Sequence, residues 1–132
     1  MSFKNLVVAL ICSGAVFLIA CSNKTVPVIN YTGTPIETSS AKPDLNKIKK
    51  AIVLGGIKAG WQMQPVADGH ILASLFSAGH IIKVDVKYDT KTYSITYKES
   101  SNLEYNGTTI SPDYNNWVGK LNSNIRSQLS KI

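Results

Sequence analysis

The chain has 132 residues, which fits a single domain, and its 14 Lys and Arg residues against 8 Asp and Glu residues give a formal net charge of +6. Its two cysteines, Cys12 and Cys21, both lie near the N-terminus, which excludes an intramolecular disulfide and a cysteine metal site in the rest of the chain. The basic residues are scattered apart from Lys47, Lys49 and Lys50, so most of them are expected to form a solvated surface.

An export signal is predicted over residues 1–20. Met1 to Asn5 carries one positive charge, Leu6 to Ile19 is apolar almost throughout, and a small Ala20 precedes Cys21. These are the charged, hydrophobic and cleavage regions of a signal peptide. The apolar run of about 14 residues is shorter than the about 20 that a membrane-spanning helix needs. A plain secretory signal that happens to contain a cysteine, or an N-terminal anchor helix, are the alternatives.

The stretch Leu18-Ile19-Ala20-Cys21 resembles the lipobox of bacterial lipoproteins. The resemblance implies that the thiol of Cys21 receives a diacylglyceryl group and that Cys21 becomes the first, acylated residue of the mature chain. Several acyl chains anchor a protein stably, because each buried CH₂ adds about 0.8 kcal/mol. Ser22 stands where lipoproteins kept in the inner membrane of enteric bacteria have Asp, which implies the outer membrane with a periplasm-facing domain. Export also argues against a nucleic-acid partner.

Residues 21–43 are predicted to form a lipidated, flexible tether. The segment is rich in Thr, Ser and Pro, carries few charges and shows no helical period, which is typical of a partly extended linker. Docking of Val26 to Tyr31 as a strand is the alternative. The domain itself is predicted over residues 44–132.

The first predicted helix begins after Asp44, whose carboxylate suits an N-cap, and it runs to about Lys58 with a stop at Gly60. Helical spacing places Leu45, Ile48, Ile52 and Gly55 on one face. We expect Gly55 to let this helix sit close to a sheet.

Three or four antiparallel strands are predicted after this helix. Trp61 to Gln64 alternates in polarity, and Pro65 either ends that strand or marks it as an edge strand. Ile71 to Phe76 is a second strand, but it is apolar on both sides, so its core face stays open. Leu103 to Tyr105 is a candidate fourth strand before the turn Asn106-Gly107.

The best-specified strands are His80 to Tyr88 and Thr92 to Glu99, which flank the turn Asp89-Thr90-Lys91. Pairing Tyr88 with Tyr93 sets Val86 against Ile95 and Val84 against Tyr97, so that one face is apolar. The opposite face is polar and carries Lys83, Asp85, Lys87, Thr92, Ser94, Thr96 and Lys98. A slip of one residue would mix the two faces, so the pattern fixes the register.

A second helix is predicted after Ser111 as N-cap, with Pro112 at its first position. Its apolar stripe contains Tyr114, Trp117, Val118, Leu121, Ile125, Leu129 and Ile132. The predicted fold class is therefore α+β, an antiparallel meander of three to four strands with an N-terminal and a C-terminal helix packed on one face.

No catalytic constellation is visible in the sequence. The only histidines, His70 and His80, are predicted at opposite ends of a strand, roughly 20 Å apart, which is too far for a shared metal ion. The carboxylates are scattered, and there is neither a Gly-x-Ser-x-Gly elbow nor a phosphate-binding loop. We therefore expect no enzymatic activity, no cofactor and no metal site.

Two clusters are more specific than composition requires: Tyr93-Ser94-Ile95-Thr96-Tyr97 with Ser100, Asn102, Leu103 and Tyr105, and Tyr114-Asn115 with Trp117-Val118. Together with Gly60-Trp61 and His80, they resemble a family of small uncharacterised proteobacterial lipoproteins, over roughly Asp44 to Ile125. The resemblance implies a lipidated envelope domain of unknown activity. The structural alternative is that these aromatic residues simply cover the core.

The leading hypothesis is a non-enzymatic outer-membrane lipoprotein whose domain binds an envelope protein. The candidate surface is the polar sheet face formed by Lys83, Asp85, Lys87, Ser94, Thr96 and Lys98. Direct binding of an anionic cell-wall glycan or lipid headgroup by the same face is the alternative. A small hydrolase or lipid-transfer domain is a third hypothesis and would need an enclosed pocket.

Overall fold

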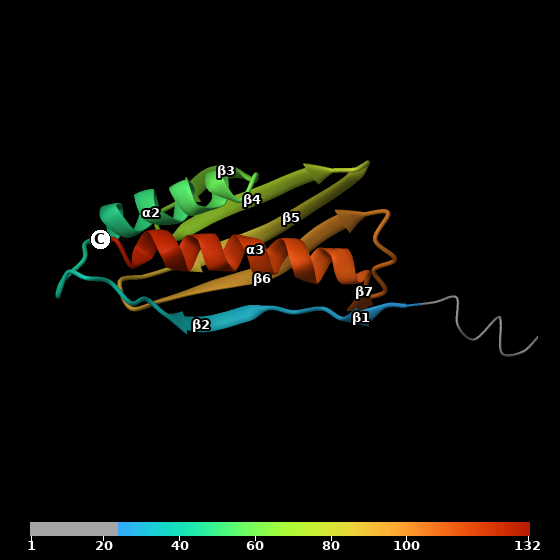
Figure 1. The fold of residues 1–132 in the computed structure, drawn as a ribbon, viewed down its shortest axis with the longest axis horizontal. Coiled ribbons are helices and arrows are strands. Elements are labelled where there is room, and N and C mark those ends of the chain that lie inside the picture. The colour runs from blue at the N-terminus through green and yellow to red at the C-terminus, as the bar shows by residue number, and fades with distance from the viewer. Residues whose placement is uncertain (1–23) are drawn as a thin grey trace, which may run out of the picture.

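The computed structural model describes residues 24–132, which form two helices and two antiparallel sheets. Their bounds are β1 (Val26–Pro27), β2 (Tyr31–Pro35), α2 (Leu45–Lys58), β3 (Gln62–Ala67), β4 (His70–Ser77), β5 (His80–Tyr88), β6 (Thr92–Ser101), β7 (Thr109–Ile110) and α3 (Pro112–Leu129). Five strands form one sheet in the order β2-β6-β5-β4-β3, and β1 pairs with β7 (Figure 1). The predicted α+β class is confirmed, whereas the predicted three or four strands are too few.

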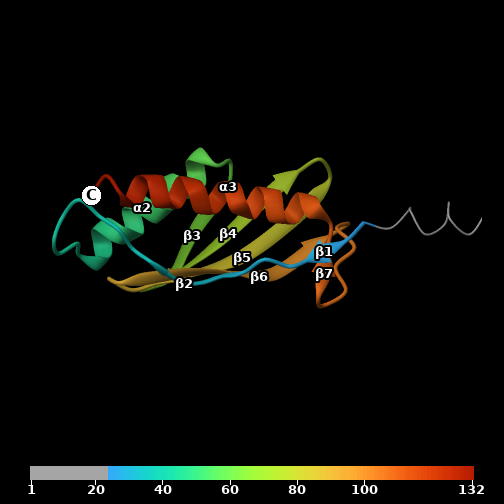
Figure 2. The same cartoon turned by 60° about the horizontal axis from the view of Figure 1, so that its bottom comes forward.

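Both helices cover the same face of the five-stranded sheet. They lie side by side above the strands, and no element described by the structure covers the opposite face (Figure 2). The helix predicted as N-terminal is preceded by two strands, so it is not the first element of the fold.

Helix α2 forms where its cap and its apolar spacing predict it. The carboxylate of Asp44 accepts a hydrogen bond of 2.8 Å from the backbone N–H of Lys47, which satisfies one free amide of the first turn. The helix ends at Lys58, and Gly60 follows with a φ of +89°, a conformation that only glycine adopts readily. Ile48 and Ile52 on its inner face are fully buried.

Gly55 serves a different contact from the one predicted. A Cβ atom at this position would lie 2.7 Å from Cα of Ile125 and 2.9 Å from the carbonyl oxygen of Asn124, both in the backbone of α3. The absent side chain therefore lets α2 approach the neighbouring helix, and the prediction of a close helix–sheet approach at Gly55 is wrong.

The sequence left open which side of β4 faces the core, and the structure shows that side. Ile71, Ala73 and Leu75 lie on the buried side, whereas Phe76 is exposed. Strand β3 lies at the edge of the sheet, as Pro65 predicts, and its register shifts between Pro65 and Ala67.

The predicted register of the β5–β6 hairpin is confirmed. Tyr88 pairs with Tyr93, Val86 with Ile95 and Val84 with Tyr97. The next pair is Lys83 with Glu99, so the register shifts by one residue at this point. Lys98 is therefore the extra residue of a β-bulge.

The prediction of a flexible tether over residues 21–43 is wrong for the part that forms β1 and β2. Strand β2 pairs with the outer edge of β6, with Tyr31 opposite Ile95, and the backbone N–H of Ile36 donates to the carbonyl oxygen of Lys91 at 2.8 Å. The side chain of Asn115 donates a hydrogen bond to the carbonyl oxygen of Pro27 in β1 and accepts one from the backbone N–H of Ile29, just after β1. The Thr- and Pro-rich composition hid this docking, which satisfies backbone groups that the edge of β6 would otherwise leave open.

The predicted strand Leu103 to Tyr105 is also wrong. Asn102 and Glu104, on either side of Leu103, have positive φ angles of 60° and 56°, which break an extended strand. The carbonyl oxygen of Leu103 instead accepts a hydrogen bond from the N–H of Ser111 at 2.8 Å. The strand of this region is β7, which pairs with β1.

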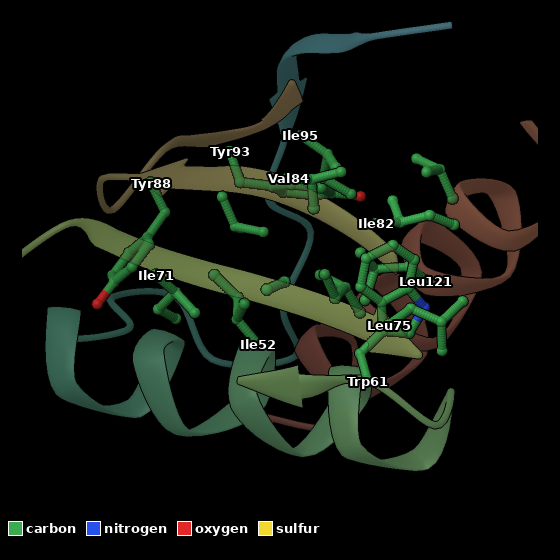
Figure 3. Close-up of a cluster of buried hydrophobic side chains, with 14 of the residues drawn as sticks. Ile52, Trp61, Ile71, Leu75, Ile82, Val84, Tyr88, Tyr93, Ile95 and Leu121 are labelled. Atoms are coloured by element: carbon green, nitrogen blue, oxygen red, sulfur yellow. The ribbon is translucent and has the colours of Figure 1, made fainter. Parts of the chain in front are cut away.

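The core lies between the sheet and the two helices. Side chains from α2, from the strands and from α3 meet there, among them Ile52, Leu75 and Leu121 (Figure 3). Ser111 precedes α3 as predicted, but its side chain makes no capping hydrogen bond. In residues 24–132, no helix has the length and apolar character needed to cross a membrane. The predicted signal segment 1–20 and Cys21 lie outside the described residues.

Candidate interaction surface

The face of the sheet opposite the helices is the candidate surface, and we call it the open face. In β5 its side chains Lys83, Asp85 and Lys87 alternate with the buried Val84 and Val86. Register places Asp85 opposite Thr96 and Lys87 opposite Ser94, so all of these lie on the same side. With Lys98, which lies near Asp85, the structure brings the six predicted residues together on one face.

Asp85 joins two cationic or polar neighbours on this face. Its Oδ1 atom lies 2.7 Å from Nε2 of His70, and its Oδ2 atom lies 3.8 Å from Nζ of Lys98. His70 begins β4 and pairs with Lys87, which places it diagonally across from Asp85. The β-bulge supplies the other contact, because Lys98 is the unpaired residue.

The remaining predicted residues differ in whether their side chains already have a partner within the domain. Lys83 forms an ion pair of 3.1 Å with Glu99, its partner across the strands. The hydroxyl of Ser94 accepts a hydrogen bond from the N–H of Gly33, so it helps to hold β2. Lys87 is exposed and forms no ion pair with any residue that the structure describes. It is therefore the most available cation of the face.

Sequence reasoning missed an apolar end of the open face. Phe76 and Ile81 pair directly across β4 and β5, and their side chains are 56% and 41% exposed. Leu72, two residues along the same side of β4 from Ser74, is partly exposed. The missing signal was the pairing of β4 with β5, which would have placed these residues beside Lys83.

The residues that carry the lipoprotein resemblance gather mainly at the end of the core. The rings of Tyr97 and Tyr105 stack with centroids 4.0 Å apart, and Tyr97 meets Tyr114 edge-on at 5.5 Å. The ring of His80 lies 5.8 Å from that of Trp117. Tyr114 is fully buried, and burial raises the pKa of its hydroxyl. This arrangement favours the structural interpretation of the cluster.

The two histidines lie at opposite ends of the β4–β5 hairpin. His80 pairs with Ser77 next to the connecting turn, whereas His70 pairs with Lys87 at the far end. Within residues 24–132, no three His, Cys, Asp or Glu side chains are grouped so that they could hold a metal ion.

Comparison with protein-family models, with curated protein sequences and with solved structures finds no match to this chain.

Proposed function

We propose that the chain is a lipid-anchored, non-enzymatic protein of the bacterial envelope whose open face binds another envelope protein. The lipobox resemblance supports a lipid on Cys21 and a periplasm-facing position at the outer membrane. The folded domain supplies a rigid strand surface that no other described element covers.

The observation that carries the proposal is the character of the open face. It combines three lysines, Lys83, Lys87 and Lys98, with two carboxylates, Asp85 and Glu99, so its net charge is only +1 with neutral histidine. Two of the lysines already have an acidic neighbour. A surface that binds a polyanionic glycan or lipid headgroup needs uncompensated positive charge, so this balance favours a protein partner.

The apolar end of the open face supports the same choice. Protein interfaces place exposed aromatic and aliphatic side chains at their centre and polar groups at their rim. Phe76 with Ile81 can supply such a centre, and the ion pairs around Asp85 and Lys83 can supply the rim.

The test is photocrosslinking in living cells from the full chain, with a photoreactive amino acid at position 76, 83 or 87. Position 91, in the β5–β6 turn, is the control. We expect one discrete protein adduct from the three positions on the open face and none from the control. Adducts only to glycan or lipid would favour the alternative, and no adduct from any position would overturn the proposed binding surface.

The lipid anchor has a separate test. Replacing Cys21 with Ala should abolish metabolic labelling with fatty acid, because no other residue of the lipobox offers a thiol. A Cys21→Ala protein that still carried label would refute lipidation at this position and leave the open-face proposal standing.

A further inference from the structure

A second surface, on the other side of the molecule, lies along the outer side of α2. We call it the α2 stripe, and it consists of Lys47, Lys50, Leu54, Ile57 and Lys58, all exposed and spaced to share one side of the helix. The apolar side chains of Leu54 and Ile57 are 43% and 57% exposed. Exposed apolar side chains that gather on one surface mark an interaction site more often than scattered ones do.

The α2 stripe contains three lysines and no acidic residue. Helix α2 contains four lysines and no acidic residue. None of these lysines forms an ion pair with a residue in the described part of the chain. This separates the stripe from the open face, where Asp85 and Glu99 balance two lysines.

Two shallow apolar grooves flank Leu54. One, of about 420 Å³, lies between α2 and the end of α3 and is lined by Lys47, Lys50, Ala51, Leu54, Gln128, Lys131 and Ile132. The other, of about 320 Å³, faces β3 and is lined by Lys49, Lys50, Val53, Leu54, Ile57 and Pro65. Lys50 and Leu54 border both grooves, so an ammonium group stands beside apolar floor on each side of the helix.

We propose that the α2 stripe lies on the surface of an anionic lipid bilayer. A helix of this kind rests in the plane of the interface, with its apolar side chains at the boundary between headgroups and acyl chains. Lysine stems extend along that boundary while their ammonium groups reach the anionic headgroups. The apolar grooves beside Leu54 and the lysines at their rims fit this occupant, because both its apolar and its anionic parts find a partner.

This placement has a consequence for the rest of the molecule. The α2 stripe belongs to the helix layer, and the open face lies on the opposite side of the sheet (Figure 2). A domain that rests on α2 therefore turns Phe76, Lys83 and Lys87 away from the bilayer, where a protein partner can reach them. The inference concerns a different surface from the proposed function and does not depend on it.

The test places a photoreactive amino acid at position 57 of the full chain, and at position 76 as the control on the open face. The protein is reconstituted into vesicles of phosphatidylcholine alone or with phosphatidylglycerol, and only chains recovered with the vesicles are analysed by mass spectrometry. We expect lipid adducts at position 57 to exceed those at position 76 by about tenfold in the anionic vesicles, and to fall in the neutral ones.

A pair of charge variants tests the electrostatic part. Lys50→Glu removes the cation that borders both grooves, and Lys91→Glu makes the same change of net charge in the β5–β6 turn. We expect Lys50→Glu to lower the adducts at position 57 about tenfold and Lys91→Glu to leave them unchanged. Circular dichroism checks that both variants are folded.

Equal amounts of lipid adduct at positions 57 and 76 would overturn the proposal. So would an amount at position 57 that changes neither with phosphatidylglycerol nor with Lys50→Glu. Crosslinks between two chains in place of lipid adducts would assign the α2 stripe to a contact between copies and would also overturn it. Because only vesicle-bound chains are counted, loss of the N-terminal anchor cannot produce these results. Neither outcome bears on the crosslinking test of the open face, so the two proposals can fail independently.

Discussion

The two faces of the five-stranded sheet come from the same strands but have opposite surroundings. In β5, Ile82 is 0% exposed beneath the helices, whereas its neighbour Ile81 is 41% exposed on the open face. On the covered face the side chains are apolar and buried, and on the open face lysines, carboxylates and a few apolar groups mix. Successive residues of a strand point to opposite faces, so one chain segment can serve two purposes.

Under the proposed function, this difference separates the residues that stabilise the fold from the residues that contact a partner. Burial of apolar area is the main favourable contribution to folding, so substitutions on the covered face should lower the free energy of unfolding. Substitutions on the open face should change stability little, and under the proposed function they should instead change partner binding. Matched pairs of neighbouring residues can test this division directly.

The largest expected effect comes from Ile82. The variant Ile82→Ala removes buried methyl and methylene groups and leaves a cavity, and we expect it to lower the free energy of unfolding by about 2–5 kcal/mol. The matched variant Ile81→Ala should change it by no more than about 0.5 kcal/mol. Urea unfolding followed by circular dichroism measures both. Equal losses in the two variants would mean that the open face is covered in solution.

The next effect lies in the helix layer. We expect Gly55→Ala to lower stability by about 1–3 kcal/mol, because its Cβ meets the backbone of α3, although alanine improves helix propensity by about 1 kcal/mol. Gly56→Ala is the control, since its Cβ meets the flexible side chain of Met63, which can move away. Thermal unfolding of both variants would distinguish them. A Gly55→Ala protein as stable as Gly56→Ala would contradict the close helix contact.

The sequence predicted the β5–β6 hairpin because one consistent alternation leaves a single acceptable register. It did not choose the core side of β4, because Leu72 and Phe76 give that strand apolar residues on both sides. Burial in the described domain does not account for the apolar side chain of Phe76, which is 56% exposed. The strand whose core side the sequence left open is therefore the same strand that contributes Phe76 to the apolar end of the open face.

Docking of β1 and β2 could not be predicted from their own composition. Whether a short Thr- and Pro-rich segment stays extended in solvent or joins a sheet depends on the strand it meets. That strand is β7 for β1 and β6 for β2, and both lie far along the chain. The His70–Asp85 pair likewise depends on the register between β4 and β5. The predicted open-face residues were found because they lie within one hairpin.

Two buried tyrosines on the covered side should respond differently to loss of the hydroxyl. The hydroxyl of Tyr93 donates to the side-chain oxygen of the buried Asn122, so Tyr93→Phe leaves that oxygen without its partner and should cost about 1–3 kcal/mol. The hydroxyl of Tyr114 has no hydrogen-bond partner in the described residues, so Tyr114→Phe should be neutral or stabilising. Chemical denaturation of both variants checks the contrast, and a larger loss in Tyr114→Phe would refute it.

The same tyrosines predict how stability changes in alkaline solution. Burial, the main cause, raises the pKa of Tyr93 to about 12 from an ordinary value of 10.0. The folded state therefore disfavours the ionised form, so this contribution is fully present below pH 10 and is lost as the pH rises toward about 12. The melting temperature should fall over this range, and less steeply in Tyr93→Phe. If the melting temperature fell equally steeply with pH in both proteins, ionisation of Tyr93 would not be the cause.

The smallest effect is expected on the open face, at Asp85. The carboxylate contacts His70 and Lys98, but partly exposed pairs of this kind contribute only about 0–1 kcal/mol, so Asp85→Asn should lower stability by no more than that. A double-mutant cycle with His70→Gln measures the coupling, and a matching cycle on the more exposed pair of Lys83 and Glu99 should give a smaller value. A coupling well above this range would make the His70–Asp85 pair part of what holds the sheet together. A small coupling would leave Asp85 free to set the charge pattern of the open face.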